Sequence, residues 1–346
     1  MLPGGCFGGG DTGPPLHVDM HAWPKFGCSY QTGMTNPACD PVLWASLLSG
    51  AGCDLTRIWA LDAWANGGNG PGEYAGHVPW LHDSNGVFDL DVPNEWYDER
   101  LHEYVQAQNA RSITVQITVL ELYTWSKLKA GELWVPNPDR GPFRRNRNGV
   151  RWGDPDDPTF FSLPDEVLAA LIARLCTATR GLAVCFEVGN EMPEKPMHAR
   201  IAAALRSHFT DDWRPDVTIN RQEDTPGRYT DMHIGQDYDR IVYHGKASLA
   251  YLDEDYPREP RFRTFRQFYA AGEYEPARII MSTDGCRARP TLDPYDWDTL
   301  AIVAQDHLRR GFSFEHQSQV KMRPFLEGHL DLQRDFEGNW LRSLRS

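Results

Sequence analysis

Several features are missing from this 346-residue sequence, and each absence narrows the class of protein. We find no uninterrupted apolar run of about 18 residues, which a membrane-spanning helix requires. Basic residues are fewer than acidic ones, 35 against 48, which gives a formal net charge of -13 and a pI near 5.4. Nucleic acids and anionic membranes bind basic surfaces, so we expect neither as a partner.

Motifs that bind phosphate or zinc are also missing. No GxGxxG follows a predicted strand, which argues against a dinucleotide-binding protein. The seven cysteines form no CxxC pair, and we expect most of them to be reduced, with a Cys28–Cys39 bridge as the alternative. We therefore expect no cofactor and no metal.

The chain begins with a stretch rich in glycine and proline, residues 1–15, which we interpret as a flexible lead-in. No basic-then-apolar secretory signal is visible there, and the compartment stays open between the cytoplasm and export after trimming. No internal repeat or second domain boundary follows. We therefore expect residues 16–346 to form a single domain.

Short β-rich segments alternate with amphipathic helical segments along this domain. Eight strands that alternate with helices predict an α/β protein with a (β/α)8 TIM barrel, and an open doubly wound sheet is the structural alternative. Long βα loops, residues 62–91 and 122–163, follow the second and third strands, on the side where barrel enzymes build their sites. The candidate strands are 15–21, 55–61, 113–122, 183–190, 217–222, 240–245, 278–285 and 311–316, and the candidate helices are 94–110, 163–180, 198–213 and 298–310.

Polar and aromatic side chains gather where the predicted strands meet the loops that follow them. The segment VCFEVGNEM is the most informative, because an apolar strand ends there in Asn190 and Glu191. Arg57 lies inside the apolar strand TRIWAL, where an unpaired cation would be costly to bury. We expect a binding site at this level, with Trp59, Trp64 and Trp125 as flat platforms for sugar rings. The other candidates are His21, Glu121, Tyr243, His244, Asp284, Glu315 and His316.

The segment FEVGNEM resembles the fourth-strand signature of the retaining glycoside hydrolases of clan A, a group of TIM-barrel enzymes that includes family 5. The resemblance extends to Arg57 in TRIWAL, to His244 in VYHG and to the helix-and-strand unit 87–122, and covers roughly residues 54–286. It implies hydrolysis of a β-linked oligo- or polysaccharide, with Glu191 as the general acid/base and Asn190 bonded to the sugar 2-hydroxyl. It also implies that Arg57 keeps the nucleophile ionised.

The seventh strand departs from the clan A pattern. Retaining glycosidases need two carboxyl groups roughly 5 to 5.5 Å apart, and the nucleophile of clan A is a glutamate at the end of this strand. The sequence here is MSTDG, with Thr283 at the expected position and Asp284 after it. Three alternatives follow: Asp284 is the nucleophile, Glu315 or Glu121 replaces it with an inverting geometry, or the barrel binds sugar without cleaving it.

A metal-dependent amidohydrolase is the alternative class of enzyme. That superfamily also uses a barrel, and His21, His244 and Asp284 resemble its metal ligands. However, the first predicted strand reads HxDxH, and the fifth, VTINRQED, lacks the expected histidine. The glycosidase interpretation is therefore preferred, with a carbohydrate as the partner, while the sugar, the linkage and the oligomeric state stay open.

Overall fold

Eight parallel strands pair edge to edge in a closed ring in the computed structural model of the protein, in the order β1-β10-β9-β8-β7-β6-β5-β2. The strands are β1 (Phe26–Ser29), β2 (Leu55–Trp59), β5 (Thr114–Thr118), β6 (Val184–Glu187), β7 (Asp216–Arg221), β8 (Arg240–Gly245), β9 (Ile279–Thr283) and β10 (Ser313–Gln317). The predicted α/β class with a parallel sheet is confirmed. The structure describes residues 22–29, 33–35, 39–60, 78–120, 146–150, 164–190, 195–221, 238–245, 278–283, 304–305 and 308–317.

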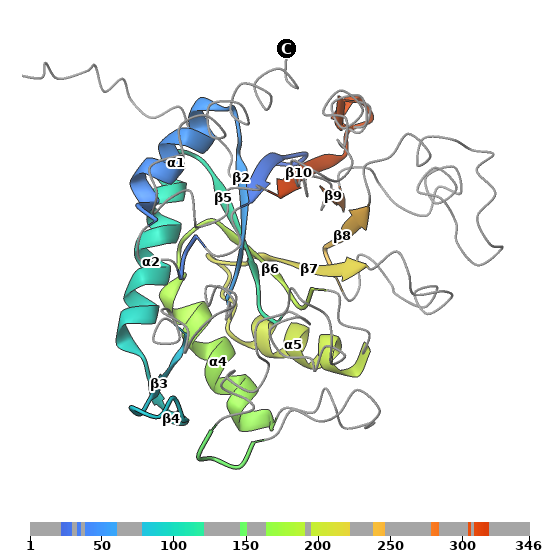
Figure 1. Ribbon diagram of the computed structural model, residues 1–346. Helices are drawn as coiled ribbons and strands as arrows, with labels where there is room; N and C mark the ends of the chain where they lie inside the picture. Colours follow the sequence, from blue (N-terminus) through green and yellow to red (C-terminus); the bar gives the residue numbers. More distant parts are fainter. Residues whose placement is uncertain are drawn as a thin grey trace, which may run out of the picture.

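Within these ranges four long helices follow one another around the outside of the ring, α1 (Pro41–Gly50), α2 (Glu95–Asn109), α4 (Asp165–Ala178) and α5 (Lys195–Ser207) (Figure 1). Local chemistry fixes where α1 begins. The Asp40 carboxylate accepts hydrogen bonds from the backbone N–H groups of Val42 and Leu43, and Pro41 occupies the first turn of α1. Helices α2, α4 and α5 confirm three of the predicted helices, whereas most of 298–310 lies outside the described residues.

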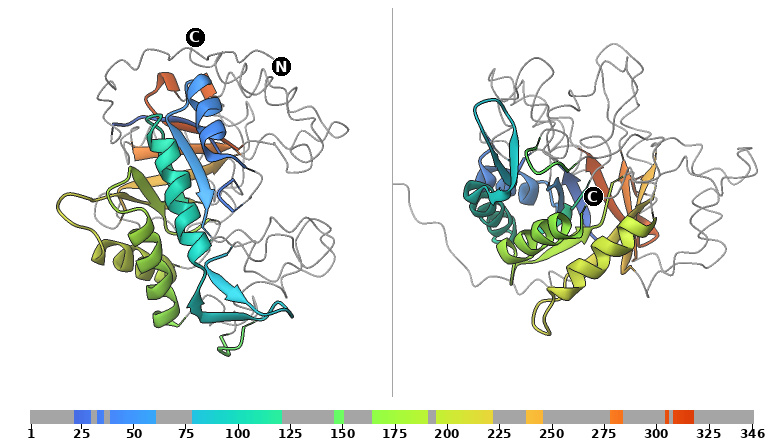
Figure 2. Two further views of the ribbon diagram at one scale, coloured as in Figure 1. Left: turned by 90° about the vertical axis from the view of Figure 1, so that its left-hand side faces the viewer. Right: turned by 90° about the horizontal axis from the view of Figure 1, so that it is seen from below.

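A small antiparallel sheet, β3 (Trp80–His82) and β4 (Phe88–Pro93), lies in the insertion after β2, beyond the amino-terminal end of α2 (Figure 2). Part of the second long insertion docks on this sheet. Asn146 forms a β-bridge with Phe88, and the Arg147 guanidinium lies 3.6 Å from the Asp83 carboxylate and 3.5 Å from that of Asp89. The two long insertions, which both begin at carboxyl ends of ring strands, therefore support each other.

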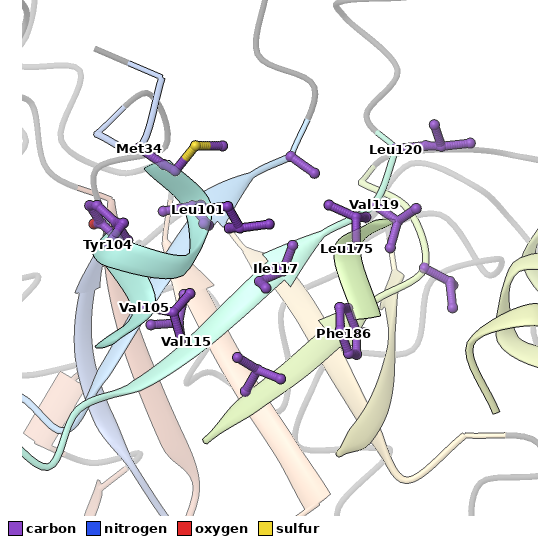
Figure 3. Packing of buried hydrophobic residues seen from close by; sticks show 14 of the residues in the cluster. Met34, Leu101, Tyr104, Val105, Val115, Ile117, Val119, Leu120, Leu175 and Phe186 are labelled. Atoms are coloured by element: carbon purple, nitrogen blue, oxygen red, sulfur yellow. The ribbon is translucent and has the colours of Figure 1, made fainter. Parts of the chain in front are cut away.

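Side chains along the ring strands alternate between two environments. Most described outward positions are apolar and pack beneath the helices, as where Val115 and Ile117 of β5 meet Leu101 and Val105 of α2 (Figure 3). The inward positions include a separate small apolar cluster of Leu55, Val242 and Ile280. Most other described inward positions are polar and fully buried, among them Arg57, Gln116, Thr118, Glu187, Thr218, Asn220, Ser282 and Glu315. The side chains that could bind or react with a ligand therefore lie inside the ring, whereas its outer face is largely apolar.

Gln116 illustrates the cost of a polar interior. Its side chain is 0% exposed, and neither amide atom has a hydrogen-bond partner among the described residues. An unpaired buried polar group costs about 1–3 kcal/mol. We expect Gln116→Met to raise the free energy of unfolding by about 1–2 kcal/mol, measured by urea denaturation with tryptophan fluorescence.

The matched control for Gln116 is Gln108 on α2, which is also fully buried and whose Oε1 also lacks a partner among the described residues, but whose Nε2 donates to the Pro41 carbonyl at 3.2 Å. Gln108→Met removes this hydrogen bond together with one unpaired acceptor, so it should stabilise the protein less than Gln116→Met does. If Gln116→Met lowers the stability, the Gln116 amide is hydrogen-bonded in solution and our interpretation is wrong.

The first strand of the ring differs from the predicted one. We expected it at residues 15–21, which lie outside the described residues, but the place between β2 and β10 belongs to Phe26–Ser29. Four residues are too few for a clear alternation of apolar and polar positions, and Gly27 interrupts them. A side chain at Gly27 would place its Cβ 2.5 Å from the Leu55 carbonyl oxygen, so the close approach of β1 to β2 requires glycine. His21 therefore does not end the first ring strand.

At the amino-terminal ends of β1, β7 and β8, the Trp23 indole joins three charged side chains. The Arg240 guanidinium lies 4.0 Å from the ring centroid and the Lys25 ammonium 5.5 Å from it. Asp216 accepts hydrogen bonds from Trp23 Nε1 at 3.1 Å and from Arg240 Nε at 2.8 Å. This cluster ties together the end of the ring opposite to the predicted site.

The described cysteines, Cys28, Cys39, Cys53, Cys176 and Cys185, are free thiols in buried positions, so the alternative Cys28–Cys39 bridge is wrong. Burial raises the pKa of the Cys39 thiol to about 12, which keeps it protonated and unreactive. None of the helices in the described ranges has the length and apolar character needed to cross a membrane.

Candidate functional site

A buried ion pair between Arg57 and Glu187 lies inside the ring, towards the carboxyl ends of β2 and β6. Arg57 Nε donates to Glu187 Oε2 at 2.7 Å, and Nη2 donates to Oε1 at 2.9 Å. Both residues are 0% exposed. Two parallel, charge-assisted hydrogen bonds give the strong bidentate arrangement that a buried pair needs to offset its lost hydration.

Two further side chains complete the surroundings of the Glu187 carboxylate. Thr118 Oγ1 of β5 donates to Oε2, and Asn220 Nδ2 of β7 donates to Oε1 at 2.7 Å. Arg57 Nε also donates to the Thr118 hydroxyl at 3.1 Å. Each carboxylate oxygen thus accepts two hydrogen bonds, and the four neighbouring strands β2, β5, β6 and β7 are held together at one level.

Asn190, the first of the two polar residues after β6, is fixed by this group. Its backbone N–H donates to the Leu120 carbonyl at 2.9 Å. Its side-chain Oδ1 accepts from Arg57 Nη2 at 2.8 Å and from Asn220 Nδ2 at 3.0 Å. Two donors facing one atom identify that atom as the amide oxygen, and they occupy both of its lone pairs. Among the described residues Asn190 Nδ2 forms no hydrogen bond, which makes it a candidate donor to a ligand.

The structure brings together only part of the predicted site. Arg57 and Asn190 are hydrogen-bonded to each other, a contact that the sequence did not predict, and Glu191 is the next residue along the chain. Six of the predicted residues lie outside the described ranges: His21, Trp64, Glu121, Trp125, Glu191 and Asp284.

Glu315 lies on the other side of the ring, in β10. It is 0% exposed and accepts a hydrogen bond from Ser29 Oγ of β1. The strand register pairs it with Ser282 of β9, which in turn pairs with His244 of β8. The backbone thus brings His244 and Glu315 to one level on either side of Ser282. Tyr243 pairs with Met281, and His316 with Thr283.

Two aromatic residues near the site are buried. Trp59 at the end of β2 is 9% exposed, so little of its ring is accessible as a platform for sugar. His198 on α5 is 1% exposed, and burial lowers its pKa to about 4, an effect that the negative charge of Glu187 partly opposes. His198 is therefore neutral at pH 7 and adds no positive charge beside Glu187.

Sequence reasoning missed Thr118, Glu187 and Asn220 as members of the site. Glu187 and Asn220 carried the same signal as Arg57, a polar side chain within an apolar strand. The contacts between them depend on the register of β2, β5, β6 and β7, which the sequence does not state.

A metal centre has no support in the described part of the chain. No group of three or more His, Cys, Asp and Glu side chains in those ranges lies close enough to hold an ion. The amidohydrolase alternative depends on His21 and Asp284, which lie outside those ranges.

Solved structures of glycoside hydrolase family 5 enzymes share the fold of this chain. A broad-specificity endoglucanase of subfamily 4 from an uncultured bacterium has a TM-score of 0.58 at 13% identity, covering 92% of this chain and 93% of its own. A family 5 enzyme from Prevotella bryantii has a TM-score of 0.52 at 10% identity, with coverage of 93% and 96%. A Bacteroides ovatus family 5 xyloglucanase has a TM-score of 0.51 at 11% identity, with coverage of 85% and 68%.

At these identities the similarity concerns the fold, and the clan A fold implied by the sequence resemblance is confirmed. No protein-family model and no curated protein sequence matches the chain.

Proposed function

We propose that the protein is a glycoside hydrolase, built on a complete (β/α)8 barrel with long βα loops, that cleaves a β-linked oligo- or polysaccharide. The observation that carries the proposal is the buried group of Arg57, Glu187, Asn190 and Asn220 at the carboxyl end of the ring. This group holds Asn190, the residue before Glu191, in place, so that the amide donor of Asn190 would lie beside Glu191. Solved family 5 enzymes with this fold support a carbohydrate substrate, since one is a xyloglucanase in complex with a heptasaccharide.

The proposed reaction proceeds in two displacements. Glu191 gives its proton to the glycosidic oxygen as the bond to the anomeric carbon breaks, and a carboxylate attacks that carbon to form a glycosyl-enzyme. Glu191, now ionised, then takes a proton from water, which attacks the same carbon and releases the sugar. The donor on Asn190 Nδ2 would bind a sugar hydroxyl next to the reacting carbon.

The alternation of β9 supports Asp284 as the nucleophile. Ile280 and Ser282 are buried at inward positions of this strand. If the alternation continues past the end of β9, residue 284 and not residue 283 takes the next inward position. Glu315 pairs with Ser282, which lies two residues before Asp284 and therefore one inward position further into the ring. Because Glu315 is fully buried, a supporting role suits it better than attack on a sugar.

The test of this function is an assay of the wild-type protein against a panel of β-linked polysaccharides and aryl glycosides. We expect cleavage with retention of the anomeric configuration, read by NMR of the first product formed. Inversion would reject Asp284 as the nucleophile and favour Glu121 or Glu315 as the base. Binding without cleavage would indicate a carbohydrate-binding barrel, and stoichiometric zinc would favour the amidohydrolase.

A further inference from the structure

Asn220 occupies a position that the proposed reaction does not use directly. Its Nδ2 donates to Glu187 Oε1 at 2.7 Å and to Asn190 Oδ1 at 3.0 Å, so both of its N–H bonds are engaged. The residue is 1% exposed, and its Oδ1 has no hydrogen-bond partner among the described residues. The position therefore uses the two donors of the amide and leaves its acceptor unused.

The two groups that Asn220 joins are both acceptors. One is the Glu187 carboxylate and the other is the amide oxygen of Asn190. Arg57 Nη2 joins the same two oxygen atoms, at 2.9 and 2.8 Å, as a second donor. Aspartate at residue 220 would have the same size but at most one donor, on a protonated carboxyl, and an aliphatic side chain would have neither donor nor acceptor.

We propose that Asn220 is a positioning residue that holds the Asn190 amide with its oxygen inward and its Nδ2 donor towards the ligand. The inference rests on the proposed function for the identity of the ligand, a sugar. It narrows what Asn190 recognises: the ligand atom facing it must carry a free lone pair, as a hydroxyl oxygen does. With aspartate in place of Asn220, residue 220 and Glu187 share one proton, because two buried carboxylates at the 2.7 Å that separates Asn220 Nδ2 from Glu187 Oε1 cannot both ionise. No donor from residue 220 is then left for Asn190 Oδ1, which keeps only Arg57 Nη2, so the orientation of the Asn190 amide is held less firmly.

The first test compares the steady-state kinetics of Asn220→Asp with those of wild type. A weaker hydrogen bond from the less firmly held Asn190 amide to the substrate should lower kcat/KM by about 10- to 100-fold. The control is Thr218→Val, on the same strand and also fully buried. Among the described residues its hydroxyl donates only to the Phe186 carbonyl, at 3.3 Å. It should leave kcat/KM within about twofold, as expected for a change outside the site.

A second test separates positioning from a general structural role. If Asn220 acts through Asn190, then Asn220→Asp should lower kcat/KM no further in a protein that already carries Asn190→Ala. Independent, multiplying losses in the double variant would overturn the proposal. So would equal losses in Asn220→Asp and Thr218→Val.

A third readout does not need turnover and therefore distinguishes this inference from the proposed function. The ¹⁵N order parameter of the Asn190 side-chain amide should fall in Asn220→Asp and stay at the wild-type value in Thr218→Val, because only the first change removes a donor to the amide oxygen. If wild type cleaves no glycoside but the order parameter falls, the proposed function fails and the role of Asn220 stands. An unchanged order parameter would overturn that role whatever the activity.

Discussion

Replacing Glu191 with glutamine is expected to lower kcat for unactivated β-glycosides by about 10²- to 10⁴-fold, because the variant has no proton to give to the leaving oxygen. Glu191 directly follows Asn190, whose backbone and side chain are both fixed at the carboxyl end of the ring. An acid that follows Asn190 in the chain would stand next to the amide donor that we propose binds the sugar. Initial rates on a polysaccharide and on its oligosaccharides give the measurement.

The dependence on the leaving group makes this test specific for acid catalysis. An aryl glycoside with a strongly acidic phenol needs no proton to depart, so its bond cleavage should be much less affected by Glu191→Gln than that of a sugar leaving group. The matched control is Glu166→Gln, the same chemical change at an exposed position in the first turn of α4. Equal losses on both substrates, or no loss on either, would reject Glu191 as the acid.

The parts of the fold that the sequence predicted well are those with a strong local pattern. Apolar strands such as 113–122 and amphipathic helices such as 94–110 bury one face, and the structure places β5 and α2 within these ranges. The strand Phe26–Ser29 was missed because its pairing with β2 and β10, not its own pattern, makes it a strand. Local signals are informative only where a segment is long enough to repeat them.

Residues of the candidate site could be predicted where their type is unusual for an apolar strand. Arg57 and Asn190 were recognised because a cation and an amide stand out in apolar surroundings. Glu187 was visible in the same strand as Asn190, but its role depends on contacts with side chains 130 positions earlier and 33 positions later. Such contacts arise from the order of strands in the ring, so residue types alone could not assign Asn220 to the site.

Breaking the Arg57–Glu187 pair on one side is expected to cost about 3–5 kcal/mol of the free energy of unfolding, because each single substitution leaves one buried charge without its partner. We expect this loss for Arg57→Met and for Glu187→Met. The double variant should lose at least about 1 kcal/mol less than the sum of the two, since it buries neither charge. Urea denaturation followed by tryptophan fluorescence measures all three.

The control for this pair is Arg147→Met, which makes the same change to a cation that is 53% exposed and lies 3.5–3.6 Å from its carboxylate partners. Exposed pairs of this kind contribute about 0–1 kcal/mol. If Arg57→Met lowers the free energy of unfolding no more than Arg147→Met does, the buried pair does not stabilise the ring. Arg57 then cannot be what holds the Asn190 amide in place. If the two single losses simply add, Arg57 and Glu187 stabilise the protein through other neighbours. A large single loss with strong coupling instead means that the stability of the ring and the geometry of the proposed site depend on the same four hydrogen-bonded side chains.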